Sequence, residues 1–387
     1  MKKTIGMILA SAAMTAPLFA QDSAAEVKDP QFSVAGEVEF EGNAHFKQVD
    51  PRDEVKNNRE TNKAFHDYSS TFGLVFSVKF NEKWSAEAGI KADDDNSSPG
   101  FAYDGAFIQY QVNDNIALKA GDFTYSEGAL RYYDYDDPGD AAFGMTERNI
   151  RGLEIDAYGL LVGFGWGRDD DDCIADENGE ELGCTSYDVH LAYELALGNH
   201  TIRPFVNYQS YQLKNGNRLR AGVTANLVFG DAMNVQVAYG LLADALKEDE
   251  PKMSHAFALE PEFNFGKLTV KGSAFYAYKA DEEDVPTEIE VPEYMFAYVE
   301  PIFAINDQLS VGVQGEYHTM STNKDDELAQ VFAGSKAYLN PTENLSLEAY
   351  VRACIPVGDD YDSDSGSDYA GQDDVYFGAG ASVGFTF

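Results

Sequence analysis

The sequence has 387 residues and a formal net charge of −38, or −38 − 2 = −40 once Lys2 and Lys3 leave with an N-terminal leader. Nucleic-acid binding needs a basic surface, so this charge excludes that class of protein. After the leader no apolar run reaches the roughly 18 residues of a membrane-spanning helix, which excludes helical insertion. The content of 23 Tyr, 25 Phe and 34 Gly favours strands and aromatic girdles at a membrane surface.

Residues 1–20 are predicted to be a secretory signal peptide. Lys2 and Lys3 form its charged start, Ile5 to Ala16 its short apolar stretch, and Leu18-Phe19-Ala20 precede the expected cleavage point before Gln21. The stretch is too short for a transmembrane helix. A helix of the mature fold is the alternative. With residues 1–20 removed as the signal peptide, residues 21–31 are expected to be a short periplasmic segment before the barrel.

Apolar and polar residues alternate from residue 32 to the end of the chain. In the first segment Phe32, Val34, Val38 and Phe40 alternate with Ser33, Ala35, Glu37, Glu39 and Glu41. This period of two is that of a strand with one apolar face. Eighteen such segments are predicted, each long enough to cross a bilayer when tilted, with sixteen as the alternative because the alternation slips in 101–125 and 150–168. The segments are 32–47, 67–80, 84–92, 101–112, 116–125, 150–158, 160–168, 187–197, 201–213, 218–229, 233–243, 255–265, 267–279, 294–305, 308–320, 328–339, 345–355 and 374–387.

Short and long connections alternate between these segments. Every second one is a tight turn rich in Asn, Asp and Gly, such as Asn113-Asp114-Asn115 and Asn340 to Asn344, whereas most of the others are long and polar. Short turns on one side and long loops on the other are typical of a transmembrane β-barrel. We therefore expect an all-β fold, an antiparallel barrel over residues 32–387, with both termini in the periplasm and the long loops outside the cell. A soluble β-sandwich would not segregate its loops in this way.

The last strand ends on a bare aromatic residue. From Val375 to Phe387 the apolar residues fall on one face, and a soluble strand of this kind would invite aggregation. The ending resembles the C-terminal signature of Gram-negative outer-membrane barrels, in which a final Phe is read by the barrel-insertion machinery. The resemblance implies that Phe387 is an assembly signal and that the outer membrane is the location. Closure of the barrel requires the last strand to pair with the first, Phe32–Phe46.

The polar faces of the strands would line the lumen. The candidate lining charges are Glu37, Glu39, Lys79, Glu87, Glu194, Arg203, Arg218, Arg220, Glu348 and Arg352. In a wide barrel such charges stay hydrated and set ion selectivity. The alternative is that they form salt bridges that stiffen the wall. We expect some of these residues to be hydrated charges that set selectivity and others to form salt bridges.

Among the long connections, 126–149 has the composition best suited to contact with polar solutes. It mixes aromatic and charged side chains, and the pore-constriction candidates are Glu127, Arg131, Tyr132, Tyr133, Asp134, Tyr135, Asp136 and Asp137. Its place after the fifth strand is similar to that of the third external loop of general porins, although no porin sequence motif is present. The resemblance implies that this loop folds into the lumen as a constriction and that the protein forms homotrimers. A solvated surface loop is the alternative.

Two further features concern the long loops. Cys173 and Cys184 share one polar segment, so they form a disulfide or remain two thiols, and Cys354 is expected to be a buried thiol on a strand. Acidic clusters such as Asp169 to Asp172 make the outer mouth negative, which should enrich cations there. They could hold Ca²⁺ or Mg²⁺ weakly, but none has the spacing of a defined calcium loop. No other cofactor or metal site is predicted.

Together these features predict an outer-membrane porin, a water-filled channel for passive diffusion of ions and small hydrophilic solutes that prefers cations. The alternatives are a saccharide-selective porin with the tyrosines of 126–149 as stacking surface, or a structural or adhesive barrel that does not conduct. Catalysis is not expected, because Asp188 and His190 with Ser186 nearby form only a weak signal without a nucleophile motif. The partners expected are outer-membrane lipid, lipopolysaccharide, the insertion machinery and small solutes.

Overall fold

The computed structural model describes residues 30–47, 64–94, 100–126, 145, 147–166, 173–175, 181–211, 217–244, 252–278, 294–319, 329–357 and 374–387. None of these residues belongs to a helix that could span a membrane. The strands are β1 Gln31–Phe46, β2 Phe65–Lys79, β3 Trp84–Asp94, β4 Gly100–Asn113, β5 Ile116–Ser126, β6 Glu147–Ala157, β7 Leu160–Trp166, β8 Cys173–Ala175, β9 Glu181–Tyr193, β10 Leu195–Leu197, β11 His200–Tyr211, β12 Arg218–Phe229, β13 Met233–Asp244, β14 Lys252–Phe265, β15 Leu268–Tyr278, β16 Tyr294–Ala304, β17 Leu309–Thr319, β18 Ala329–Thr342, β19 Leu345–Val357 and β20 Tyr376–Thr386.

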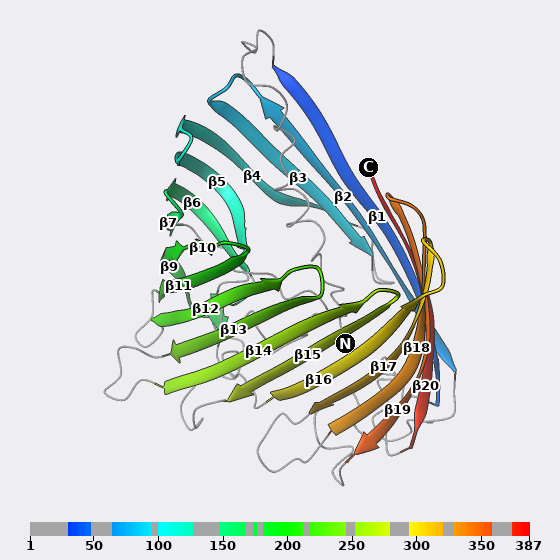
Figure 1. The fold of residues 1–387 in the computed structure, drawn as a ribbon. Helices are drawn as coiled ribbons and strands as arrows, with labels where there is room; N and C mark the ends of the chain where they lie inside the picture. The colour runs from blue at the N-terminus through cyan, green and yellow to red at the C-terminus, as the bar shows by residue number, and fades with distance from the viewer. Residues whose placement is uncertain are drawn as a thin grey trace.

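These strands form one closed antiparallel barrel with neighbours in chain order (Figure 1). β8 pairs only with β9 and stands outside the barrel wall, while β9 and β10 are two parts of one strand, interrupted at Glu194, that both pair with β11. The 20 strand segments therefore make 20 − 2 = 18 strands of the barrel wall. The prediction of eighteen strands is confirmed, and the alternative of sixteen is wrong.

The barrel closes where its last strand meets its first (Figure 1). β20 pairs with β1 from Glu37↔Thr386 to Phe46↔Phe377. One residue further on, the backbones of Gly36 and Phe387 exchange two hydrogen bonds of 3.0 Å each. The predicted pairing of the C-terminal strand with the first strand is confirmed, and it removes the open edge that a lipid environment cannot satisfy.

The tight turns lie together at one rim of the barrel. Tyr158 and Gly159, which link β6 to β7, both have positive φ (55° and 81°), as a two-residue hairpin with the twist of its strands requires. Most predicted boundaries agree with the structure to within a few residues. Two differ more. β9 begins six residues before the predicted 187, and β18 runs to Thr342, into the predicted turn 340–344. Pro341 is tolerated there because the pairing of β18 with β19 shifts between Leu339 and Thr342.

A bulge explains why the alternation slips in 101–125. Ala88 of β3 faces Ala106 of β4, but Ile90 faces Tyr103, so Asp104 and Gly105 together oppose Gly89. Gly105 has φ +86°, a conformation that favours glycine at this bulge position. The extra residue moves the outward face from odd numbers at Tyr103 to even numbers at Ala106 and Ile108.

Candidate functional site: the channel lumen

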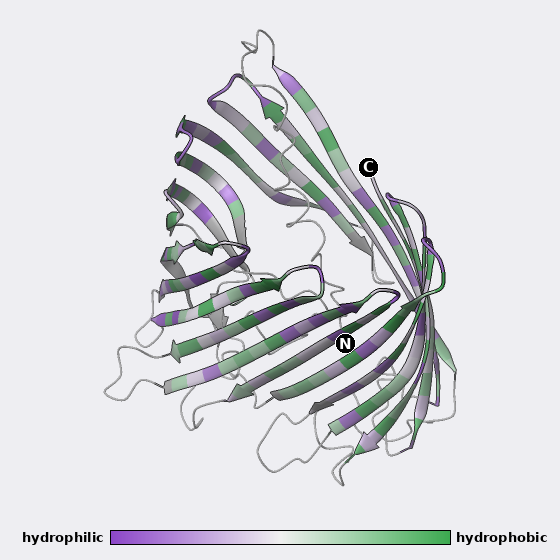
Figure 2. Cartoon of the chain, in the orientation of Figure 1, coloured by the Kyte–Doolittle hydropathy of each residue, from purple (hydrophilic) through white to green (hydrophobic). Residues whose placement is uncertain are grey.

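Hydrophobic and hydrophilic residues alternate along the strands of the barrel wall (Figure 2), so one face of the wall is apolar and the other is mostly polar. On β1 the side chains of Phe32, Val34 and Phe40 are 78%, 51% and 59% exposed, whereas Asn43 on the alternate face is buried. Large apolar side chains with such exposure recur on the same face of every long strand. An outward apolar band of this kind is expected where lipid surrounds the barrel.

Aromatic side chains border this outer face at both rims. Near the tight turns they are Phe80, Trp84, Tyr158, Tyr193, Phe229, Phe265, Phe303, Phe385 and Phe387. Towards the opposite rim they are Tyr68, Tyr103, Trp166, Tyr187, Tyr239, Tyr276 and Tyr278. Two aromatic girdles around an apolar band are characteristic of transmembrane barrels.

Ionisable side chains of both signs lie on the inner face, and carboxylates are in excess among the described residues. The carboxylates are Glu37, Glu39, Glu41, Asp67, Glu87, Glu154, Asp156, Asp188, Glu260, Glu262, Glu300, Glu316 and Glu348. The cations are Lys79, Lys91, Lys119, Arg203, Arg218, Arg220, Lys271, Lys336 and Arg352. All the predicted lumen residues are among them except Glu194, which lies at the break between β9 and β10.

Several of these charges are paired across strands. Lys336 lies 2.5 Å from Glu348, Lys119 lies 3.5 Å from Glu154, and Arg203 lies 3.8 Å from Glu194. The salt-bridge interpretation therefore applies to these residues. The carboxylates of Glu37, Glu39 and Glu41 follow one another along the inner face of β1. The two neighbouring strands, β2 and β20, carry no cluster of Lys or Arg beside this acidic row.

Arg220 belongs to a buried polar network and not to an open surface. Its guanidinium donates to Gln209 and, at 3.4 Å, to Asn207, and Asn207 donates at 2.5 Å to Asp188. Arg220 is 5% exposed and the neighbouring His190 1%. Neither group is placed to act on a solute in the lumen.

Part of the inner face is apolar, which sequence reasoning missed. Phe205, Leu242, Phe275 and Phe296 face inward from β11, β13, β15 and β16, yet each is at most 3% exposed. They belong to one buried cluster with inward-facing alanines and with Met145, which is fully buried. Met145 lies in the connection between β5 and β6, so this residue packs inside the barrel against the wall opposite β1. The available signal was that Phe205, Phe275 and Phe296 occupy the polar faces of their own strands.

The constriction candidates Glu127, Arg131, Tyr132, Tyr133, Asp134, Tyr135, Asp136 and Asp137 lie outside the described residues, as do residues 1–29 and the acidic clusters at 169–172 and 281–284. Within the described part of the chain, no group of His, Cys, Asp and Glu could hold a metal ion. The backbones of Cys173 and Cys184 face each other in the β8–β9 register, and Cys354 is a buried free thiol.

Comparison with known proteins gives a clear answer only at the level of structure. No family model and no curated protein sequence matches the chain. Among solved structures, the barrel is similar to OccK2 (OpdF) of Pseudomonas aeruginosa, with a TM-score of 0.58, 10% identity, and coverage of 94% of this chain and 99% of that one. It is also similar to OccAB3 of Acinetobacter baumannii (TM-score 0.55, 9% identity, 92% and 100% covered) and to the outer membrane channel DcaP of the same species (TM-score 0.50, 14% identity, 93% and 98% covered).

The chain has the fold of Gram-negative outer-membrane channels. The similarity extends over almost the full length of each barrel, and the apolar outer band agrees with a place in the outer membrane. At these identities the comparison establishes the fold, and the solute and selectivity must be argued from the residues of this chain.

Proposed function

We propose that this barrel is a passive channel through which ions and small hydrophilic solutes cross the outer membrane, with a preference for cations. The local excess of carboxylates on β1, where Glu37, Glu39 and Glu41 share the inner face, is the observation that carries the proposal, because the surplus elsewhere on the wall consists of buried groups such as Glu260 and Glu300. In a hydrated lumen such an excess raises the local concentration of cations and lowers that of anions. The row Glu37, Glu39 and Glu41 is expected to contribute most, because three like charges follow one another on one strand.

The connection 126–149 is proposed to narrow the lumen. The buried position of Met145 among Phe205, Phe275 and Phe296 supports this, since it brings one end of the connection against the inner wall. The solute path would then run along the arc of the wall from β17 through β20 to β3, where the acidic row of β1 lies. Tyr132, Tyr133 and Asp134 would stand at the narrowest point.

Three further parts of the proposal concern partners and ions. We expect a homotrimer, contact with lipopolysaccharide, and insertion by the barrel-assembly machinery through Phe387. We also expect weak binding of Ca²⁺ or Mg²⁺ at the acidic external loops, because clustered carboxylates favour hard cations. Titration of these ions while the open-channel current is recorded would test the last point.

Selective saccharide uptake is the second candidate. One structural neighbour, OccK2, was solved in complex with glucuronate. In this chain Tyr132, Tyr133 and Tyr135 would provide the stacking surface. Block of the ionic current by a neutral sugar, abolished in Tyr132→Ala or Tyr133→Ala, would favour this candidate, and an unblocked current would exclude it.

Single-channel recording in a planar bilayer tests the proposed channel directly. Stepwise conductance on addition of the folded protein is the expected result. A bilayer that stays sealed while folded protein is demonstrably inserted would leave the structural or adhesive barrel as the better account.

A further inference from the structure

Carboxylates from β1 and β19 come close together in the lumen, over the last strand of the barrel. Ser382 of β20 pairs with Glu41 of β1 on one side and with Glu348 of β19 on the other. The residues two before and two after Ser382 are glycines, so little side chain separates the two carboxylates, whose backbones lie roughly 10 Å apart. Glu39 interacts electrostatically with both of them. Like charges at this spacing attract cations to one place on the wall.

Lys336 of β18 is a cation that lies beside these carboxylates. Its Nζ is 2.5 Å from Glu348 Oε2, and its charge also acts on Glu39. The side chains of Lys336 and Glu348 are 28% and 37% exposed, so ions in the lumen can reach both members of the pair. The ammonium therefore opposes the attraction of the carboxylates at the place where that attraction is strongest.

A series of contacts holds Lys336 in this position. Its Nζ lies 5.1 Å from the centre of the Tyr338 ring, and the Tyr338 hydroxyl donates a hydrogen bond of 2.5 Å to Glu300 Oε1 on β16. Tyr298 donates to the other oxygen of the Glu300 carboxylate, which is 1% exposed. The Glu300 side chain passes over β17 at Gly312, where a Cβ would lie 2.3 Å from Oε1. The buried carboxylate thus fixes the Tyr338 ring, and the ring and Glu348 together fix the ammonium.

We propose that Lys336 limits how strongly the lumen holds cations and so sets the degree of cation preference, a role that rests on the cation-preferring channel proposed for this barrel. Conduction requires that an ion bind strongly enough to enter and weakly enough to leave. Without Lys336, the carboxylates of Glu39, Glu41 and Glu348 would lose the ammonium that lies among them. A passing cation would then be held longer, and anions would be excluded more strongly.

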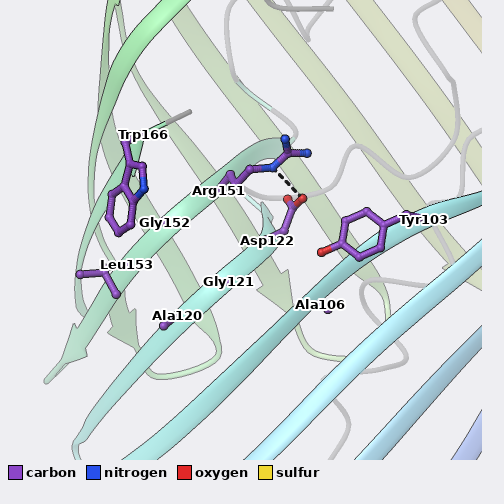
Figure 3. Close-up of a pocket in the computed structure, with 9 residues that line it drawn as sticks. All are labelled: Tyr103, Ala106, Ala120, Gly121, Asp122, Arg151, Gly152, Leu153 and Trp166. Carbon is purple, nitrogen blue, oxygen red and sulfur yellow. Dashed lines mark hydrogen bonds and ion pairs between the residues drawn. The ribbon is translucent and has the colours of Figure 1, made fainter. Parts of the chain in front are cut away.

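Two cations on β5 and β6 differ from Lys336 in their positions. Arg151 lies 3.0 Å from Asp122 in a hollow of the wall (Figure 3), and it faces outward because it alternates with the inward Glu154, so it adds no charge to the lumen. Lys119 faces inward, lies 3.5 Å from Glu154 and is 22% exposed. It resembles Lys336 in pairing and exposure but lies four strands from β1, which makes it the matched control.

Reversal potentials in a planar bilayer test the role of Lys336. The KCl gradient should be centred near 0.1 M, where the screening length is about 10 Å. Lys336→Gln should raise the permeability ratio of K⁺ over Cl⁻ about two-fold, because one unit charge within roughly 10 Å changes the occupancy of the two ions in opposite directions. Lys336→Arg keeps the charge and should leave the ratio unchanged. The double variant Lys336→Gln, Glu348→Gln restores the net charge, so its ratio should return towards that of the unmodified protein.

The concentration dependence of the conductance provides a second readout. In Lys336→Gln the KCl concentration that gives half of the maximal single-channel conductance should fall about two-fold, because a path that holds cations more strongly saturates earlier. Lys119→Gln makes the same change of charge and should alter neither quantity. A Lys336–Glu348 pair that only stiffens the wall would give a less stable Lys336→Gln barrel with both quantities unchanged, and that result would overturn the proposal.

The unmodified protein separates two kinds of failure. Absence of conductance, or a preference for anions, would contradict the proposed channel and with it the role of Lys336. A cation-selective unmodified protein would uphold the channel, and Lys336 alone would then lose its assigned role if Lys336→Gln changed the ratio no more than Lys119→Gln. Heat-dependent gel mobility should show that each variant is folded before it is recorded.

Discussion

The phenol of Tyr350 on β19 donates a hydrogen bond of 2.6 Å to Asn43 Oδ1 on β1. Strand β20 lies between these two strands, and the residue of β20 beneath the bond is Gly380, which pairs with both. Asn43 donates in turn to Asp67 of β2 at 2.9 Å, and His45 lies 2.9 Å from the same carboxylate. Side chains of β19, β1 and β2 are therefore linked to one another over β20, across the closure of the barrel.

Gly380 is expected to be essential to this linkage. A Cβ at this position would lie 2.3 Å from Asn43 Oδ1 and 2.5 Å from a ring carbon of Tyr350, so Gly380→Ala must displace the Tyr350–Asn43 bond. We expect a loss of about 1–3 kcal/mol in the free energy of unfolding, measured by urea titration in lipid vesicles.

Gly378→Ala is the control for this prediction. It lies on the same face of the same strand, but its nearest neighbour, a side-chain carbon of Arg352, would be 3.7 Å from the new Cβ, which is ordinary contact. The stability of this variant should be nearly unchanged. Equal effects of the two substitutions would contradict the linkage.

Removal of Phe387 is expected to impair assembly. The deletion abolishes two backbone hydrogen bonds to Gly36 and the ring that stacks on Phe385 at 6.0 Å, whereas Phe387→Ala removes the ring alone. We expect a several-fold lower yield of folded barrel for the deletion, with normal conductance of the molecules that fold. If the ring is the signal, Phe387→Ala should show the same loss. An unaffected yield in both variants would show that the terminal residue has no role in assembly.

The barrel could be predicted from sequence because its main determinants are local. The alternation in Phe32 to Phe40 and the Asn- and Gly-rich turns fix which residues face lipid and where strands reverse, and each is visible within a few residues. The bulge at Asp104 and Gly105 shifted this pattern, and only the pairing with β3 reveals it.

The interior was harder to predict, since it depends on contacts between distant segments. Met145 meets Phe205, Phe275 and Phe296 only when the barrel has closed, so no local pattern in the sequence shows what covers an inward Phe. In the same way, Asp122 and Arg151 are 29 residues apart, and the charge of Arg151 on an apolar face has a partner only in the folded wall.

Cys173 and Cys184 are expected to form a disulfide in the exported protein. Their backbones are direct partners in the antiparallel β8–β9 pairing, and the Cα separation of such partners is within the range that a disulfide spans. Alkylation after denaturation without reductant should modify Cys354 alone, because that thiol is free and buried in the native fold. Modification of all 3 cysteines would exclude the bridge.

Met145→Asp should widen or destabilise the narrow part of the channel. A carboxylate is unfavourable among Phe205, Phe275 and Phe296, so the connection should leave the inner wall. The expected results are a larger or noisier single-channel current and faster proteolysis between β5 and β6. Met145→Leu keeps an apolar side chain of similar volume and should behave as the unmodified protein. An unchanged current in Met145→Asp would argue against a constriction held at this point.

Ion selectivity is the property that most directly tests a channel whose acidic wall prefers cations. The measurement is the reversal potential in a planar bilayer under a KCl gradient. The reversal potential of the unmodified protein should have the sign of a channel that passes K⁺ more readily than Cl⁻. In the triple variant Glu37→Gln, Glu39→Gln, Glu41→Gln the reversal potential should shift towards zero. Glu260→Gln should leave it unchanged, because the Glu260 side chain is 0% exposed. A reversal potential of the opposite sign, or one that the triple variant leaves unchanged, would contradict the proposed origin of selectivity.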